Sequence, residues 1–186
     1  MAGTNTQTHF RLRNDDGGEG NASWAAALDA NPAGVNCGVT YRVRFAILNS
    51  VGGPFAPTLY YSLNGGAYFR VGTSSNVVRP HASALVADGE TTTQQITAGD
   101  FLASSIDTVD GAVVPFSASA GKSAEIEFSV QFRSVDLANG NTVALRVYDS
   151  ASPLSGYSAT PALVVAKLSR IPLVARRRRV VGGGVS

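Results

Sequence analysis

Alternation of apolar and polar residues is the strongest pattern along the chain, and it predicts β-strands. Residues 39–48, "VTYRVRFAIL", place an apolar or aromatic side chain at every second position. This period of two is typical of a strand that buries one face, because successive side chains point to opposite sides of a sheet. The side chains expected to face inward are Val39, Tyr41, Val43, Phe45 and Ile47.

Residues 124–134, "AEIEFSVQFRS", show the same alternation. The apolar set is Ile126, Phe128, Val130 and Phe132. Glu125 and Glu127 fall on the opposite face, which we expect to meet solvent. Two carboxylates on a solvent face would serve solubility.

Weaker patterns predict further elements. Residues 57–71, "PTLYYSLNGGAYFRV", are typical of a hairpin, because Asn64-Gly65-Gly66 accept positive φ between two β-rich arms. Residues 142–149 and 160–166 alternate like the strands above. Additional strand candidates are 8–13, 21–28, 75–80 and 92–97, and 98–105 is a candidate for a short helical turn.

Turn-forming clusters separate these segments, and no helical period is sustained. The chain is therefore predicted to be all-β, with a single antiparallel β-sandwich of immunoglobulin-like or jelly-roll topology. Residues 1–7 are predicted as an N-terminal arm, 8–166 as the sandwich domain and 167–186 as a basic C-terminal arm.

Charge divides the 186-residue chain into two parts. Residues 1–166 contain nine Arg or Lys and thirteen Asp or Glu, a net charge of −4, whereas residues 167–186 contain six basic residues and no acid. The acidic body disfavours a nucleic-acid partner, although the basic arm could still contact one. The arm is suited to any acidic surface.

Other composition features narrow the class of protein. Cys37 is the one cysteine, which excludes an internal disulfide and a cysteine-based zinc site. The N-terminal residues lack the features of a signal peptide, and no segment is apolar over a membrane-spanning length. We expect the protein to be made in a reducing cytosol.

The stretch "RNDDGGEG", residues 13–20, combines three acids with three glycines. Neither Asn14 nor Asp15 as first ligand gives the oxygen spacing of an EF-hand calcium loop. A phosphate-binding loop would need a Lys, which is absent here. The stretch is predicted to be an acidic turn between two strands, and a loosely bound calcium ion is the alternative.

No residue set indicates catalysis. His9, His81 and Cys37 are scattered, with no base or metal ligand beside them in the sequence. The pairs Asp107/Asp110 and Glu125/Glu127 could be considered for a glycosidase, but nothing distinguishes them from ordinary surface carboxylates. We predict no catalytic, cofactor-binding or metal-binding residues and no enzymatic activity.

Aromatic residues offer a binding alternative. Trp24, Tyr60, Tyr61, Tyr68 and Phe69 are expected mainly in the core and at its rim. An exposed subset would form a platform on which sugar rings stack.

The arginine run in "ARRRRVV" is the most informative charged feature. Crowded arginines favour an acidic partner, and the guanidinium group pairs well with carboxylates. The predicted partner-binding residues of the arm are Arg170, Leu173, Val174, Arg176, Arg177, Arg178, Arg179, Val180 and Val181.

Four segments together resemble the β-sandwich virion proteins of tailed bacteriophages. They are "THFRLRNDDGGEGNASW", "TLYYSLNGGAYFRVGTSSNVVRP", "DGETTTQQIT" and "EIEFSVQFRSVDLANGNTVALRVYD", and the resemblance extends over residues 8–166. It implies a non-enzymatic part of a virus particle and brings no catalytic residues. The expected location is the virion, after synthesis in the host cytoplasm.

The resemblance implies several roles. We expect a capsid decoration or cement protein that binds the major capsid protein or other virion subunits and forms a homo-oligomer. The alternatives are a neck or tail component and a receptor-binding or carbohydrate-binding adhesion module.

Overall fold

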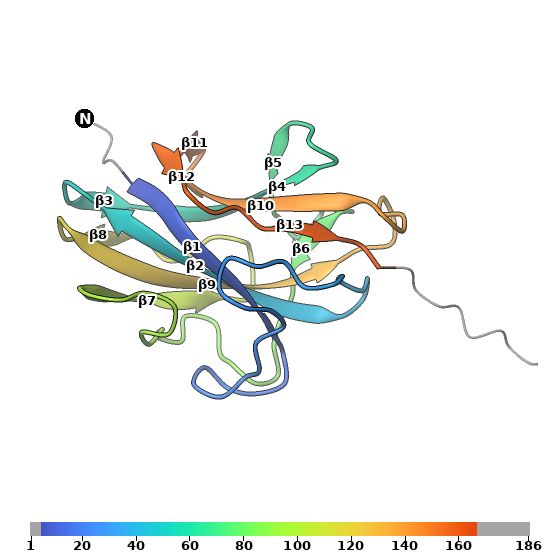
Figure 1. Ribbon diagram of the computed structural model, residues 1–186, viewed down its shortest axis with the longest axis horizontal. Helices are drawn as coiled ribbons and strands as arrows, with labels where there is room; N and C mark the ends of the chain where they lie inside the picture. The colour runs from blue at the N-terminus through green and yellow to red at the C-terminus, as the bar shows by residue number, and fades with distance from the viewer. Residues whose placement is uncertain (1–4, 167–186) are drawn as a thin grey trace, which may run out of the picture.

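The computed structural model describes residues 5–166, which form an all-β protein without a helix in that range. Three sheets are present (Figure 1). The first has the strand order β12-β1-β2-β9-β6, with β7 also paired to β9. Its strands are β1 (Asn5–Asn14), β2 (Thr40–Asn49), β6 (Val78–Pro80), β7 (Phe101–Asp107), β9 (Lys122–Phe132) and β12 (Gly156–Tyr157).

The second sheet has the order β11-β10-β4-β5, with β13 also paired to β10. Its strands are β4 (Pro57–Leu63), β5 (Tyr68–Arg70), β10 (Thr142–Asp149), β11 (Ser152–Pro153) and β13 (Ala162–Val164). β3 (Gly53–Phe55) and β8 (Phe116–Ala118) form a small third sheet. Pairing is mainly antiparallel, but the pairs β1–β12 and β7–β9 are parallel. The first sheet is therefore mixed, whereas the sequence predicted antiparallel pairing throughout.

The two larger sheets share one hydrophobic core, and β4 and β10 of the second sheet lie above β2 and β9 of the first in Figure 1. The first sheet contributes residues such as Phe45 and Phe128, whose rings meet edge to face at 6.2 Å. The second contributes Leu59, Leu145 and other apolar residues of β4, β10 and β13. The predicted inward set is confirmed except for Val39, which precedes β2 and is 44% exposed.

The hairpin predicted at 57–71 is confirmed as β4 and β5. Asn64 and Gly65 adopt φ values of 50° and 75°, the left-handed region that Asn and Gly tolerate best. The strands predicted at 8–13, 75–80, 142–149 and 160–166 are present in whole or in part as β1, β6, β10 and β13. β1 also includes residues 5–7, which were predicted to belong to the N-terminal arm.

Three predictions of secondary structure are wrong. Residues 21–28 make irregular hydrogen bonds along β1 and only one isolated bridge, between Trp24 and Arg13. Residues 92–97 form a loop: the Thr92 amide bonds to Ser104 of β7, whereas the amides of Gln95, Ile96 and Thr97 bond to a carboxylate. Most of the helical turn predicted at 98–105 is the parallel strand β7.

The prediction of a solvent face on β2 and β9 is also wrong. Arg42 and Arg44 on β2, and Glu125 and Glu127 on β9, each have 0% of their surface exposed. Loop residues 15–19 and 92–97 contact this face through hydrogen bonds and ion pairs. Alternation distinguishes the two faces of a strand but does not reveal what covers the polar one.

Six side chains form a buried cluster beneath these loops, the arginine–glutamate network. Its members are Arg13, Arg42, Arg44, Glu19, Glu125 and Glu127. Arg44 is central, because it contacts Glu127 at 2.6 Å, Glu19 at 2.7 Å and Glu125 at 3.2 Å. Glu127 also lies 3.4 Å from both Arg13 and Arg42.

The network binds the loops by their backbone. The Glu125 carboxylate accepts hydrogen bonds from the amides of Gln95, Ile96 and Thr97 at 2.9–3.0 Å. Glu19 accepts one from the amide of Thr93 at 2.8 Å. The loop amides are therefore satisfied by buried charge where no strand is available.

Residues 15–20 form a loop after β1, as predicted, but two of its three acids, Asp15 and Glu19, point into the protein. Glu19 is buried against Arg44, and Asp15 accepts a hydrogen bond from Ser83 and lies 3.5 Å from Arg42. Asp16 accepts bonds from the amide and hydroxyl of Ser23. All three carboxylates thus have donors within the protein.

Opposite charge controls ionisation in the network. Burial would raise the pKa of Glu19, but hydrogen bonds from Thr93 and Arg44 outweigh it and leave the pKa below its usual value. Burial would likewise lower the pKa of Arg44, whereas Glu127 and Glu19 raise it overall. Both groups are therefore ionised in the folded protein at neutral pH.

We expect Glu127→Gln to lower the free energy of unfolding by about 3–5 kcal/mol, because it leaves buried arginines without their shared counter-ion. Urea denaturation measures this change. The matched control is Asp136→Asn, an exposed acid whose loss should change stability by less than about 0.5 kcal/mol. Equal stability of the two variants would contradict a structural role for the network.

Candidate functional site

Three tyrosines and an arginine line up on the side of the second sheet that faces away from the core, and Tyr157 of the first sheet, which also packs against the core, joins them; we call these five residues the tyrosine ladder. Tyr60 on β4, and Arg146 and Tyr148 on β10, alternate with buried Leu59, Leu145 and Val147 and so point outward. Tyr68 of β5 and Tyr157 of β12 complete it.

The rings of the ladder are in continuous contact. Tyr60 and Tyr148 stack with centroids 4.0 Å apart at an interplanar angle of 15°. Tyr148 and Tyr68 follow at 6.1 Å, and the Arg146 guanidinium lies between Tyr68 and Tyr157, 4.8 and 4.3 Å from their centroids. Stacking and cation–π attraction hold each member in place, which makes the surface rigid.

Burial disfavours ionisation of three of these phenols. It raises the pKa of Tyr157 to about 12, and it also raises the pKa values of Tyr68 and Tyr148. The Tyr157 hydroxyl donates to the Val147 carbonyl and accepts from the Leu154 amide. At neutral pH the ladder therefore presents uncharged rings, with Arg146 as its only charge.

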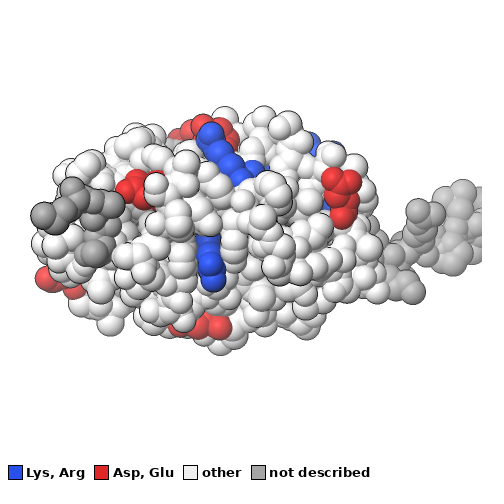
Figure 2. Space-filling view, turned by 90° about the horizontal axis from the view of Figure 1, so that it is seen from above, with Lys and Arg blue, Asp and Glu red and all other residues white. Residues whose placement is uncertain are grey.

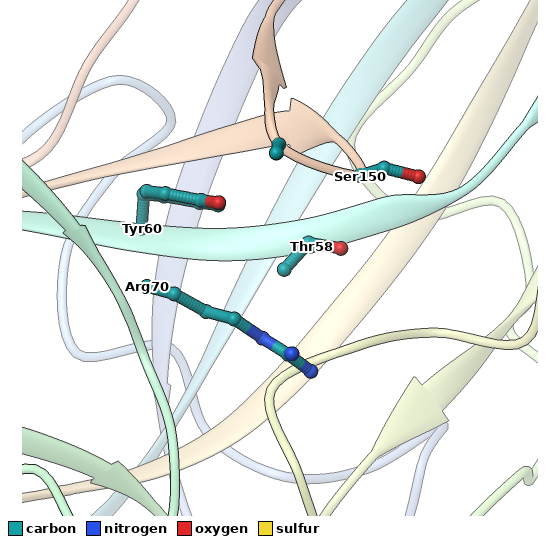
Figure 3. A pocket seen from close by; sticks show the side chains of 5 residues that line it. Thr58, Tyr60, Arg70 and Ser150 are labelled. Carbon is teal, nitrogen blue, oxygen red and sulfur yellow. The ribbon is translucent and has the colours of Figure 1, made fainter.

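A hollow of about 280 Å³ lies at the Tyr60 end of the ladder (Figure 3). It is lined by Thr58, Tyr60, Arg70, Ser150 and Ala151, and we call it the Arg70 hollow. In Figure 3 the Tyr60 and Arg70 side chains extend in a similar direction from neighbouring strands, towards the end where Thr58 and Ser150 lie. The lining thus combines one ring, one guanidinium and three hydroxyls.

Arg70 has no side-chain hydrogen bond, ion pair or ring contact with any other residue of the range 5–166, and it is exposed. It also lines a second hollow of about 360 Å³ with Gly72, Thr73, Ser74 and Asp110. One free cation therefore stands between two neighbouring hollows, both bordered by hydroxyl groups.

The predicted aromatic platform is divided among three places. Tyr60 and Tyr68 belong to the ladder. Tyr61 and Phe69 contact each other from the opposite side of the same strands, at 6.0 Å. Trp24 lies elsewhere, beneath the guanidinium groups of Arg11 and Arg13.

Sequence reasoning missed Arg70, Arg146, Tyr148 and Tyr157. The alternation around Leu145 and Val147 could have placed Arg146 and Tyr148 on an outer face. Their contact with Tyr60 depends on the pairing of β10 with β4, which the sequence pattern does not supply.

The histidines and the cysteine occupy structural positions. His9 contacts the Asp29 carboxylate at 2.7 Å, and His81 contacts the Thr40 hydroxyl at 3.0 Å. Cys37 is buried, which raises its thiol pKa and weakens it as a nucleophile. Within residues 5–166, no group of three or more His, Cys, Asp or Glu could hold a metal ion.

Asp107 and Asp110 share one turn. Asp107 is buried, and its carboxylate accepts hydrogen bonds from the amides of Val109, Asp110 and Gly111. Burial raises the pKa of Asp107 to about 6, and these amide bonds only partly oppose that rise. The geometry indicates a carboxyl group that organises the turn after β7.

Most surface charge on the described part of the chain is negative. Residues 5–166 include six exposed acids and one exposed Arg or Lys, which is Arg70. The exposed acids are Asp16, Asp29, Asp88, Asp100, Asp110 and Asp136. On the face shown in Figure 2, basic side chains stand apart from one another and form no continuous patch among the described residues.

The predicted arm contacts lie outside the described residues. They are Arg170, Leu173, Val174, Arg176, Arg177, Arg178, Arg179, Val180 and Val181. Among residues 5–166 no helix is long and apolar enough to cross a membrane.

No family model, curated protein or solved structure matches this chain.

We expect Asp107→Asn to remove a pH-dependent contribution to stability. The pKa of Asp107 in the folded protein, about 6, lies above its ordinary value of 3.8, so between these values the folded state binds a proton that the unfolded chain releases. The stability contributed by Asp107 is therefore present at low pH and is lost as pH rises through 6.

Urea denaturation from pH 4 to pH 7 measures this effect as the difference in the free energy of unfolding between the native protein and the variant. That difference should fall by up to about 3 kcal/mol as pH rises. Asp136→Asn, which replaces an exposed acid, is the matched control. A difference that rises with pH would contradict the assignment.

Proposed function

We propose that this chain is a non-enzymatic structural protein of a phage particle, most specifically a capsid decoration or cement subunit. We assign its domain to a single β-sandwich, immunoglobulin-like or jelly-roll, that carries terminal arms. The resemblance of residues 8–166 to phage virion proteins supports this role. The all-β body with one shared core is consistent with it.

The unequal distribution of charge between the body and the C-terminal segment is the main support for this proposal. The arginine–glutamate network buries three arginines and three glutamates, so it leaves the net charge of the body negative, and the exposed charged groups of the described residues are mainly acidic. Residues 167–186 add six basic residues and no acid. Every copy thus combines an acidic body with a basic segment, and such copies attract one another or an acidic shell.

In this role the C-terminal segment binds a neighbour. Arg170 and Arg176–Arg179 pair with carboxylates of an adjacent copy, of the major capsid protein or of another virion subunit, because guanidinium groups form bidentate bonds to carboxylates. Leu173, Val174, Val180 and Val181 add apolar contacts. Symmetry repeats the interface around the particle, so a modest gain per subunit becomes large for the shell.

Deleting residues 168–186 should abolish this binding, whereas replacing Arg176–Arg179 with Gln should weaken it and reduce its dependence on salt. Co-sedimentation with phage particles that lack the protein, at a series of salt concentrations, measures both effects. Arg133→Gln, which removes one positive charge from the body, is the control. Undiminished binding after the deletion would refute the role of the segment.

Two other functions are distinguishable from cement. A neck or tail component would occur in ring stoichiometry at one vertex of the particle, which cryo-electron microscopy of the virion would reveal. A receptor-binding or carbohydrate-binding module is favoured by one specific observation, the outward-facing tyrosine ladder.

A further inference from the structure

We propose that the Arg70 hollow binds an acidic sugar, that is, a pyranose unit that carries a carboxylate. This inference concerns a surface of the body and does not rest on the virion role or on the C-terminal segment.

The polar lining suits a sugar. Tyr60 and Ser150 each bring a hydroxyl that can donate and accept hydrogen bonds, as sugar hydroxyls do, and the Thr58 hydroxyl, which donates to the Ala56 carbonyl, can accept one. Tyr60 adds an aromatic ring beside them, and pyranose C–H groups pack favourably on such rings. A hollow with this composition has no deep apolar floor for the anchor side chain that a peptide ligand usually inserts.

Arg70 supplies the charge selectivity. Its guanidinium has no partner among residues 5–166, and it is the one exposed Arg or Lys on a body whose exposed acids are Asp residues. A free fork of N–H donors binds a carboxylate through two parallel hydrogen bonds. The surrounding acidic surface repels anions elsewhere, so an acidic ligand is directed to this position.

The second hollow extends the site. Arg70 is shared by both hollows, and the second adds the hydroxyls of Thr73 and Ser74. Two adjacent hollows with a cation between them fit consecutive units of an oligosaccharide better than one monosaccharide. Asp110, in the second hollow, would repel a carboxylate that pointed towards it, so we expect Arg70 to bind its carboxylate on the Tyr60 side, with the carboxylates of neighbouring units directed to solvent.

The aromatic side of the Arg70 hollow is fixed before any ligand binds. Tyr60 is stacked on Tyr148, and Tyr148 contacts Tyr68, so the ring that borders the hollow is fixed by the ladder. Thr58 and Tyr60 lie on β4, which is paired to β10 on one side, and Tyr60 is opposite Arg70 of β5 on the other. A fixed lining reduces the entropy lost on binding.

Titration of the full 186-residue chain with trigalacturonate, followed by NMR at about 0.15 M salt, tests the proposal. We expect saturable shifts of the Thr58, Tyr60 and Ser150 amides. Maltotriose, which is neutral, should bind at least about tenfold more weakly, because it lacks the charge-assisted pair with Arg70.

Variants separate this site from general attraction of anions. Arg70→Gln should weaken trigalacturonate binding about tenfold or more, and Arg70→Lys should restore part of it. Arg133→Gln removes the same charge from another arginine whose side chain has no partner among the described residues, so it should leave the affinity within twofold. Arg70 is exposed, and its replacement is not expected to disturb folding.

Three results would overturn the proposal. The first is the absence of shifts at the Arg70 hollow. The second is equal loss of affinity in Arg70→Gln and Arg133→Gln, which would indicate charge attraction without a site. The third is binding of triglutamate at the same amides as tightly as trigalacturonate, which would assign the hollow to acidic peptides instead of sugars.

Discussion

The buried arginine–glutamate network is the constraint on which the rest of this structure depends. It lies on β1, β2 and β9, where the opposite faces of the same strands form the hydrophobic core. Removing an ion from water costs several kcal/mol, so these charges persist only because they are paired and hydrogen-bonded. Residues 15–19 and 92–97 supply much of that compensation, which makes the loops part of the folded body.

The charge of the surface comes from outside the network. The three arginines and three glutamates that the network buries cancel in charge, so the four excess acids of residues 1–166 belong to the rest of the body, whose one exposed Arg or Lys among the described residues is Arg70. On the second sheet, by contrast, aromatic stacking and the cation–π contacts of Arg146 organise the outer face. The two sheets therefore share apolar packing inside, while their outer faces are organised by charge on one and by rings on the other.

Much of the β architecture could be predicted from the sequence, because alternation in 39–48 and 124–134 and the Asn-Gly turn at 64–65 are local signals. The same alternation placed Glu125 and Glu127 on a solvent-exposed face. This was wrong because the loops that cover that face are distant from β9 in the sequence. Residues 92–97 were predicted as a strand, but the amides of Gln95, Ile96 and Thr97 bond to Glu125 instead of to a neighbouring strand. The tyrosine ladder was only half predicted, because it needs the register of β4 against β10.

Native-state hydrogen exchange of the Gln95, Ile96 and Thr97 amides tests the central claim most directly, because all three donate to the buried Glu125 carboxylate. If the network holds the loops to the sheet, these amides exchange only when the core unfolds, and their protection against exchange matches that of the amides of β2 and β9. Exchange at the rate of an exposed loop, while β2 and β9 stay protected, would show that the loops merely cover the sheet and that the network does not hold them.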